Sequence, residues 1–321
     1  MPEPLIECRK VSKYFPIKGL LRDVGSVRAV EQVNLTVHKH QTYGLVGESG
    51  CGKTTLARTI MRLIPPTAGE IYFGGRNILT FAKDELKKFR RDTSIVFQDP
   101  YTSLDPRMII ADVVGEPLSI HGIAYGEDRE DMVLSLLDKV GLKPEHMYRY
   151  PHEFSGGQRQ RIAIARALAG NPKFVLLDEA SSALDVSVQA KILNLLNRLK
   201  KNLALTYLFI SHNLSVISHI SDEIGVMYLG ELVEQGSREQ VFDSPLHPYT
   251  QGILTASPKL DPDKRTLFEK AVLKGEVPSA INPPAGCRFH PRCPMVIPLC
   301  SQEWPALRDM GEGHLVSCHR A

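Results

Sequence analysis

Runs of apolar residues mark the strands that this sequence predicts. Residues 5–14 and 27–37 alternate apolar and polar side chains, as strands with one buried face do. Residues 174–177 are apolar without interruption, a pattern that is typical of parallel strands covered on both faces. Further strands are expected at 44–46, 69–73, 93–97 and 206–211, an exposed insertion at 18–25, and a hairpin over 222–236 that turns at Gly230-Glu231.

Apolar positions at helical spacing predict a block of helices in the middle of the chain. Residues from about 108 to 170 have this pattern, and one face there carries Met132, Leu136, Leu137 and Val140. A second amphipathic helix, after residue 185, carries Ile192, Leu195, Leu196 and Leu199. Because strands and helices alternate elsewhere, we expect an α/β fold with a helical insertion at about 100–171.

A glycine-rich segment between a strand and a helix is the most specific chemical pattern. It consists of Gly47, Glu48, Ser49, Gly50, Cys51, Gly52, Lys53 and Thr54, and Thr55 follows in the helix. The spacing G-x-x-x-x-G-K-[ST] in this context is that of a phosphate-binding loop, whose amides surround an anion at the start of a helix. We expect Lys53 to reach the β- and γ-phosphates of a nucleotide and the Thr54 hydroxyl to bind Mg²⁺.

Polar groups also follow the predicted strands and precede a helix. Asp178 and Glu179 follow the strand at 174–177, and His212 follows the strand at 206–211; ligands of open α/β sheets bind at such carboxyl ends. Ser155 is a good N-cap for the next helix. Taken singly, the two carboxylates could be solvated acids at a strand end, the histidine could be structural, and the segment at Ser155 could be a flexible turn. The phosphate loop upstream favours the functional interpretation.

Composition restricts the class of protein. The chain has 321 residues with 43% hydrophobic and 23% charged residues, which is ordinary for a globular protein. Its net charge of +3 does not argue for nucleic acid as a partner. The first residues lack the pattern of a secretory signal, and no apolar run is long enough to cross a membrane. We therefore expect a location on the cytoplasmic side and six cysteines that do not form disulfides.

In their order along the chain, these motifs resemble the ATPase subunits of ABC transporters. The resemblance covers about residues 5–245 and rests on the Walker A loop at 47–54, the Q-loop at Gln98, the signature Ser155-Gly156-Gly157-Gln158, the Walker B pair Asp178-Glu179, the D-loop at 182–185 and the H-loop at His212. Residues 243–250 and 275–287 resemble the C-terminal region of dipeptide and oligopeptide importers, in particular their F-type ATP-binding subunits. One departure is Ala180-Ser181, where the family usually has proline after the glutamate.

The resemblance implies a fold and a role for each motif. It implies a P-loop NTPase (RecA-like) core with an antiparallel β-subdomain and a helical insertion, and ATP and Mg²⁺ as cofactors. Thr54, Gln98 and Asp178 would hold the metal, Glu179 would act as general base, and His212 would contact the γ-phosphate. The remaining nucleotide contacts would come from Phe15 (with Tyr14 as its rival for the base), the loop residues 47–55, Ser155, Gly156, Gly157, Gln158 and Asp185.

The same resemblance implies domains, partners and a location. The ATPase domain would span 1–245, and residues 246–321 would form a loop-rich extension. A second, non-identical ATPase subunit would dimerise head to tail with this chain, so that each signature motif completes the partner's site. Two membrane permease subunits and an extracytoplasmic peptide-binding protein would complete an importer of dipeptides or oligopeptides. This chain would lie at the cytoplasmic face of the membrane and would bind no nucleic acid.

Four cysteines near the C-terminus call for a separate explanation. Cys287, Cys293, Cys300 and Cys318 have the spacing C-x₅-C-x₆-C-x₁₇-C among prolines and glycines. Tight C-x₂₋₄-C pairs, the usual sign of structural zinc, are absent, whereas four cysteines also fit an iron–sulfur cluster. Peptide importers of the family are similar in having a 4Fe-4S centre, so a cluster is the leading interpretation, with zinc and free thiols as alternatives.

Two other functions compete with peptide import. Importers of nickel and other small solutes use similar ATPases, and the cargo is selected by other subunits. A soluble ABC ATPase that acts on nucleic acid or ribosomes is the rival of a different class. A strongly basic surface or a second nucleotide-binding domain would favour that rival, and the sequence contains neither.

Overall fold

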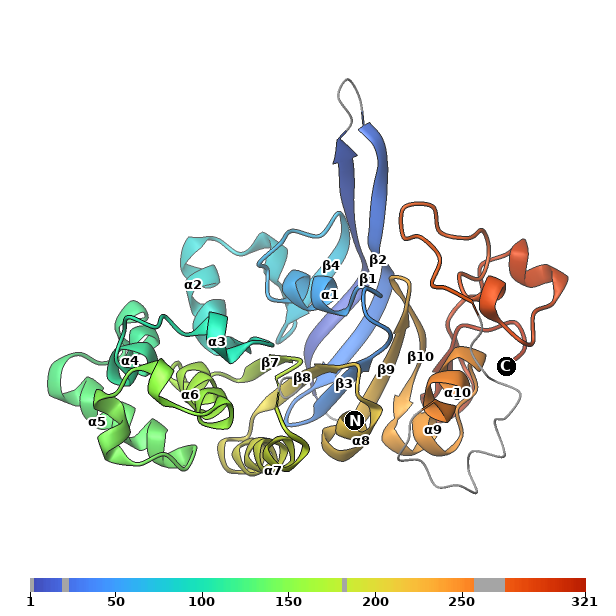
Figure 1. Cartoon of the computed structure of the whole chain (residues 1–321). Helices are drawn as coiled ribbons and strands as arrows, with labels where there is room; N and C mark the ends of the chain where they lie inside the picture. Colours follow the sequence, from blue (N-terminus) through green and yellow to red (C-terminus); the bar gives the residue numbers. More distant parts are fainter. Residues whose placement is uncertain (1–2, 19–22, 181–183, 257–274) are drawn as a thin grey trace. The chain divides into compact units, whose positions relative to one another are not determined.

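The computed structural model describes residues 3–18, 23–180, 184–256 and 275–321 (Figure 1). The chain divides into two compact units. The first contains Val37–Gln41 and Thr80–Ile210, and the second contains Pro4–Thr36, Thr42–Leu79 and Ser211–Ala321. The predicted insertion at 18–25 and the D-loop lie partly outside the described residues.

The first unit contains a parallel sheet and most of the long helices. Strand β7 lies between β6 and β8, and its five residues are all buried, as expected for a strand covered on both faces. The elements are α2 (Lys83–Asp92), β6 (Thr93–Val96), α3 (Pro100–Ser103), α4 (Ile110–Ile120), α5 (Gly126–Lys139), η2 (Pro144–Tyr148), η3 (Pro151–Glu153), α6 (Gly156–Leu168), β7 (Phe174–Asp178), α7 (Val186–Leu203) and β8 (Thr206–Ser211).

Helices α4, α5 and α6 pack against one another and form the predicted helical block. On α5, Leu136 and Leu137 are buried, and Val140 directly after the helix is fully buried. Met132 is 36% exposed, although it has the same spacing. The face that α4 and α6 cover therefore includes three of the four predicted positions, and Met132 lies at its margin.

The second unit contains strands from both ends of the chain. One sheet has the order β2-β1-β4-β5, and the other strands follow the order β11-β12-β10-β9-β3. The pairing of β3 with β9 is parallel, whereas β10 is antiparallel to β9 and to β12. The strands are β1 (Pro4–Lys18), β2 (Asp23–His38), β3 (Thr42–Val46), β4 (Ala68–Phe73), β5 (Arg76–Asn77), β9 (Glu223–Tyr228), β10 (Glu231–Ser237), β11 (Arg308–Asp309) and β12 (Leu315–Val316).

Short helices and loops complete the second unit, and its C-terminal part is rich in loops as expected. The helices of the unit are α1 (Lys53–Ile60), α8 (Leu214–Ile220), α9 (Arg238–Asp243), α10 (Pro248–Thr255), η5 (His290–Arg292) and η6 (Pro298–Ser301), with η1 (Ile78–Thr80) at its boundary. None of the helices in the described ranges is both long and apolar enough to span a bilayer.

Candidate functional site

The predicted phosphate loop connects the buried strand β3 to helix α1. Gly52, the residue before the helix, has a φ of 106°, a backbone conformation that residues other than glycine rarely adopt. A Cβ on Gly52 would lie 2.0 Å from the carbonyl oxygen of Ala29, and one on Gly47 would lie 2.1 Å from that of Met227. Both glycines are therefore required by the close approach of the neighbouring backbone.

Lys53 lies inside this loop and is buried. Its Nζ donates hydrogen bonds to the carbonyl oxygens of Gly47 at 2.7 Å and of Glu48 at 2.9 Å, and lies 3.5 Å from the Sγ of Cys51. The loop thus surrounds a fixed positive charge at the start of a helix, an arrangement suited to binding an anion. Burial raises the pKa of the Cys51 thiol, although Lys53 lowers it in part, which favours the protonated form.

In the first unit, a hydrogen bond joins two of the predicted site residues. The Nε2 of Gln98 donates to Oε2 of Glu179 at 2.8 Å. Glu179 follows the end of β7 with a φ of 48°, and its backbone N–H donates to the carbonyl oxygen of Ile210 at 3.0 Å. Asp178, the last residue of β7, is buried. These three side chains offer oxygen atoms, the donors that Mg²⁺ prefers.

The signature residues form the start of helix α6, as predicted. Ser155 is the N-cap: its Oγ accepts a hydrogen bond from the Gln158 N–H, and the Gln158 side chain accepts one from the Ser155 N–H at 3.1 Å. A Cβ on Gly157 would lie 2.5 Å from Cγ1 of Val188 in α7, so this glycine permits close packing of the two helices. Asp185, the exposed N-cap of α7, is described, whereas residues 181–183 of the D-loop region are not.

His212 and Phe15, the remaining predicted site residues, are exposed residues of the second unit. His212 follows β8 directly, as expected. Phe15 has 39% of its surface accessible, and its ring centroid lies 5.1 Å from the Nζ of Lys13. The hydroxyl of Tyr14, its rival, donates a hydrogen bond to Glu31. This hydrogen bond holds the Tyr14 side chain and leaves Phe15 as the more accessible ring.

Contacts to the loop from the C-terminal region were not predicted from the sequence. The Nη atoms of Arg292 bind both carboxylate oxygens of Glu48, at 2.7 and 3.1 Å. The hydroxyl of Tyr249 accepts a hydrogen bond of 2.9 Å from the Glu48 N–H. The resemblance singled out residues 243–250, but no local pattern indicated a partner about 200 residues away.

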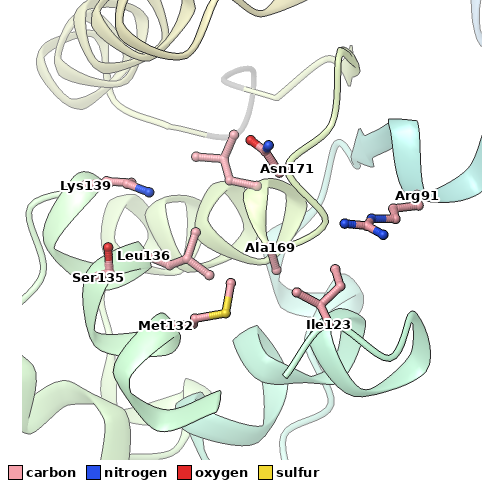
Figure 2. A pocket seen from close by; sticks show the side chains of 9 residues that line it. Arg91, Ile123, Met132, Ser135, Leu136, Lys139, Ala169 and Asn171 are labelled. Atoms are coloured by element: carbon pink, nitrogen blue, oxygen red, sulfur yellow. The ribbon is translucent and has the colours of Figure 1, made fainter. Parts of the chain in front are cut away.

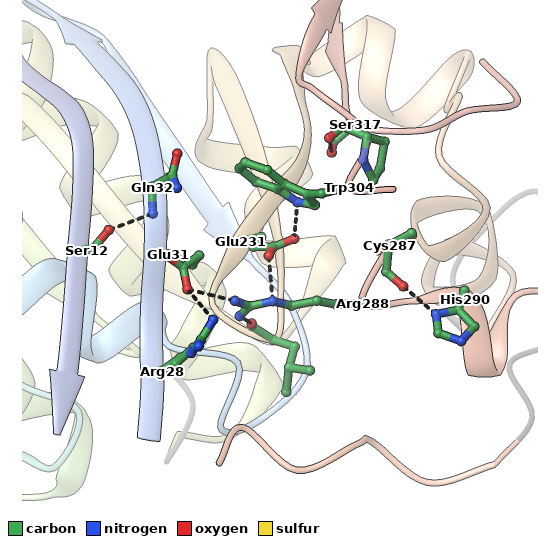
Figure 3. Close-up of polar contacts among 12 residues, drawn as sticks. Ser12, Arg28, Glu31, Gln32, Glu231, Cys287, Arg288, His290, Trp304 and Ser317 are labelled. Carbon is green, nitrogen blue, oxygen red and sulfur yellow. Dashed lines mark hydrogen bonds and ion pairs between the residues drawn. The ribbon is translucent and has the colours of Figure 1, made fainter. Parts of the chain in front are cut away.

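A second arginine of this region forms a buried cluster of charges (Figure 3). Arg288 binds Glu31 at 2.9 Å and Glu231 at 2.5 Å, and the indole N–H of Trp304 donates to Glu231 at 3.0 Å. Burial raises the pKa of Glu231 to about 7, although Arg288 lowers it in part. The cluster connects the C-terminal region to β2, the strand that contains Glu31.

The structure does not support the expected iron–sulfur cluster. Cys287, Cys293, Cys300 and Cys318 form no disulfides, and among the described residues no group of three or more Cys, His, Asp or Glu side chains is placed to hold a metal ion. Burial raises the pKa of Cys287 to about 12 and also raises the pKa of Cys293, and the charges of the neighbouring cysteines act on both in the same direction.

A pocket in the first unit contains none of the predicted site residues (Figure 2). It has a volume of about 340 Å³ and is lined by apolar side chains such as Ile123, Met132 and Leu136. Arg91 and Lys139 also line it. This pocket is therefore separate from the residues to which the motifs point.

Comparison with known proteins establishes the family. The model of the ABC transporter family matches residues 30–182. An oligopeptide transport ATP-binding protein, AppF of Bacillus subtilis, is 48% identical over 320 residues, which cover 99% of this chain and 97% of the relative. The chain belongs to the ABC transporter ATP-binding proteins. The dipeptide transport ATP-binding protein DppF of Escherichia coli is 47% identical over 319 residues, 99% of this chain and 95% of that protein.

Solved structures of ABC ATPases have the same fold. The ATP-binding cassette MJ0796, solved as a dimer in a post-hydrolysis state bound to ADP and Pi, matches with a TM-score of 0.65 and 31% identity, over 73% of this chain and 99% of that one. The protein cbiO1 of Clostridium perfringens matches with the same TM-score at 24% identity, over 83% of this chain and 99% of that one. These matches confirm the expected P-loop NTPase fold. The model of the oligopeptide/dipeptide transporter C-terminal region matches residues 233–300 of this ABC protein.

Proposed function

We propose that this chain binds and hydrolyses ATP and thereby energises the import of dipeptides or oligopeptides. The observation that carries the proposal is the loop of residues 47–54, in which Lys53 is buried and two glycines have no room for a side chain. Relatives of similar length are named as oligopeptide and dipeptide transport ATP-binding proteins. A chain that matches their C-terminal region as well as their ATPase part is best interpreted as the same kind of subunit.

The side chains of the loop have roles in binding the triphosphate. In this structure the Lys53 ammonium donates to the carbonyl oxygens of Gly47 and Glu48. When ATP binds, the β- and γ-phosphate oxygens would replace these carbonyls as its hydrogen-bond acceptors. Its charge would offset the negative charge of the equatorial oxygens. Phe15, which is exposed, would stack on the base. Ser49 and Gly50 form the exposed tip of the loop, where backbone amides are accessible.

Mg²⁺ would be held by Thr54, Gln98 and Asp178, whose oxygen atoms fit this ion. When bound, the ion would offset charge on the phosphate oxygens. Glu179 would orient the attacking water and accept its proton, and Gln98 would hold the Glu179 carboxylate in place. His212 would contact the γ-phosphate.

The partners follow from the signature motif and from the family. Ser155, Gly156, Gly157 and Gln158, with Asp185, would bind the nucleotide of a second ATPase subunit, which we propose to be a different chain. Contacts to the γ-phosphate that form only in the closed dimer would shift the equilibrium between open and closed states. Two permeases and an extracytoplasmic peptide-binding protein would complete the importer, with this chain at the cytoplasmic face of the membrane.

Purification and transport measurements test this function. We expect the tagged chain to copurify with a second ATPase and two permeases, and the complex in liposomes to take up labelled dipeptide with ATP inside. Glu179→Gln should retain ATP binding and lose roughly a hundredfold or more of kcat. Uptake of Ni²⁺ in place of peptide would assign the alternative cargo. Copurified nucleic acid with ATPase activity that it stimulates would favour the soluble class and contradict the proposal.

A further inference from the structure

Glu48 connects the phosphate loop to the C-terminal region through three different groups. Its side chain accepts two hydrogen bonds from Arg292, its N–H donates to the Tyr249 hydroxyl, and its carbonyl oxygen accepts a hydrogen bond from the Lys53 Nζ. A single loop residue therefore contacts both the proposed phosphate-binding ammonium and the C-terminal region. All four residues belong to the second unit.

The ion pair of Arg292 with Glu48 is largely shielded from water. The Arg292 side chain is 6% exposed, and that of Glu48 is 30% exposed. The parallel, two-bond geometry fixes the direction of the carboxylate as well as its distance from the guanidinium. The hydrogen bond to Glu48 raises the pKa of Arg292 further above its ordinary value, so this arginine stays charged.

Aromatic packing holds the C-terminal partners of Glu48 in place. Tyr249 in α10 and Phe289 beside η5 are fully buried, with ring centroids 5.5 Å apart. Tyr228 at the end of β9 contacts both rings, with its centroid 4.7 Å from that of Tyr249 and 5.3 Å from that of Phe289. Its hydroxyl lies 3.4 Å from Nη1 of Arg292. Close-packed rings leave little freedom to the groups attached to them.

We propose that Arg292 and Tyr249 are positioning residues for nucleotide binding, which act through Glu48 to set the loop that holds Lys53. The proposal rests on the function proposed for the phosphate loop and extends it to the region matched by the oligopeptide/dipeptide transporter C-terminal family. In this account the C-terminal region belongs to the ATP-binding machinery. Rearrangement of that region would change the affinity for ATP, and by linkage ATP would favour one arrangement of it.

Nucleotide affinity of the full-length chain is the direct test. We expect Arg292→Ala and Tyr249→Phe each to raise the Kd of a fluorescent ATP analogue with Mg²⁺ about tenfold, a typical size for coupling between sites. Arg308→Ala is the matched control, because Arg308 also lies in the C-terminal region but donates to the carbonyl oxygens of Cys318 and Ala321. This control should bind the analogue like the wild type. Arg292→Lys should recover part of the affinity.

A double-variant cycle tests the route of the effect. If Arg292 acts through the Glu48 carboxylate, Arg292→Ala should add little to the loss caused by Glu48→Gln. Equal Kd values for wild type, Arg292→Ala and Tyr249→Phe would overturn the proposal, even if the variants melt at lower temperature. Tyr249→Phe removes one oxygen atom and keeps the ring, so it remains informative if Arg292→Ala fails to fold. Unchanged binding by Lys53→Ala would contradict the proposed function of the loop itself.

Discussion

The amide of Gln98 donates a hydrogen bond of 2.8 Å to the carboxylate of Glu179, 81 residues further along the chain. Gln98 follows strand β6 and Glu179 follows strand β7, and these two strands are parallel neighbours. The register of the sheet therefore brings both side chains to the same edge. In the proposed mechanism, this hydrogen bond orients the general base before ATP is hydrolysed.

Loss of the Gln98 amide should reduce turnover more than ATP binding. In Gln98→Ala, the Glu179 carboxylate loses the hydrogen bond from Gln98, and one proposed Mg²⁺ ligand is removed. We expect kcat of the assembled transporter to fall roughly tenfold to a hundredfold, because positioning of this kind contributes that much in enzymes. Steady-state ATPase assays provide the measurement. A kcat equal to that of the wild type would separate Gln98 from the chemistry.

Two glycines of the phosphate loop should respond differently to the same substitution. In Gly52→Ala, the added Cβ would lie 2.0 Å from the carbonyl oxygen of Ala29, so the loop must move and ATP binding should be lost. In Gly50→Ala, no heavy atom lies within 4 Å of the added Cβ, and only its φ of 79° imposes a cost, on the order of 1–2 kcal/mol. ATP titration and thermal unfolding test whether Gly52→Ala loses more ATP binding and more stability than Gly50→Ala. Similar losses in the two would contradict the described packing.

The buried carboxyl of Glu231 should make folding stability depend on pH. Its pKa is raised from 4.5 to about 7 by burial, so folding favours the protonated form. This stabilisation is complete below pH 4.5 and is lost as the pH rises to about 7; its full extent is on the order of 3 kcal/mol. In Glu231→Gln the side chain cannot ionise, so the variant should lack this decrease in folding stability.

Urea unfolding at pH 5 and pH 8 measures the effect of Glu231. We expect the free energy of unfolding of Glu231→Gln, relative to wild type, to increase between these two values of pH. Arg288 and Glu31 lie beside this carboxyl and are present in both proteins, so their own contributions largely cancel in the comparison. Parallel pH profiles would show that Glu231 does not titrate in this range.

Local patterns in the sequence predicted the elements that carry the motifs. The run at 174–177 became the buried strand β7, because an apolar run without charges fits a strand that is covered on both faces. Ile192, Leu195, Leu196 and Leu199 are all buried on α7, as their spacing required. Ser155 caps α6 for the reason that made it a predicted N-cap: its oxygen accepts a hydrogen bond from the Gln158 N–H.

Contacts between distant segments could not be predicted in the same way. Nothing near Glu48 or near Arg292 indicates that they form an ion pair, since 244 residues separate them and most charged residues lie in water. The number and spacing of the four C-terminal cysteines likewise do not determine whether they hold a metal, because metal binding depends on the directions and distances of the thiols.

Equilibrium binding of ATP with Mg²⁺ to the full chain and to Lys53→Ala shows whether Lys53 holds the triphosphate. The control is Lys39→Ala, which removes the same charge from a lysine that pairs with Glu3 at 2.6 Å. If Lys53 holds the phosphates, its replacement should weaken binding roughly a hundredfold or more, whereas Lys39→Ala should bind ATP like the wild type. Equal affinities of all three proteins would mean that residues other than Lys53 hold the triphosphate.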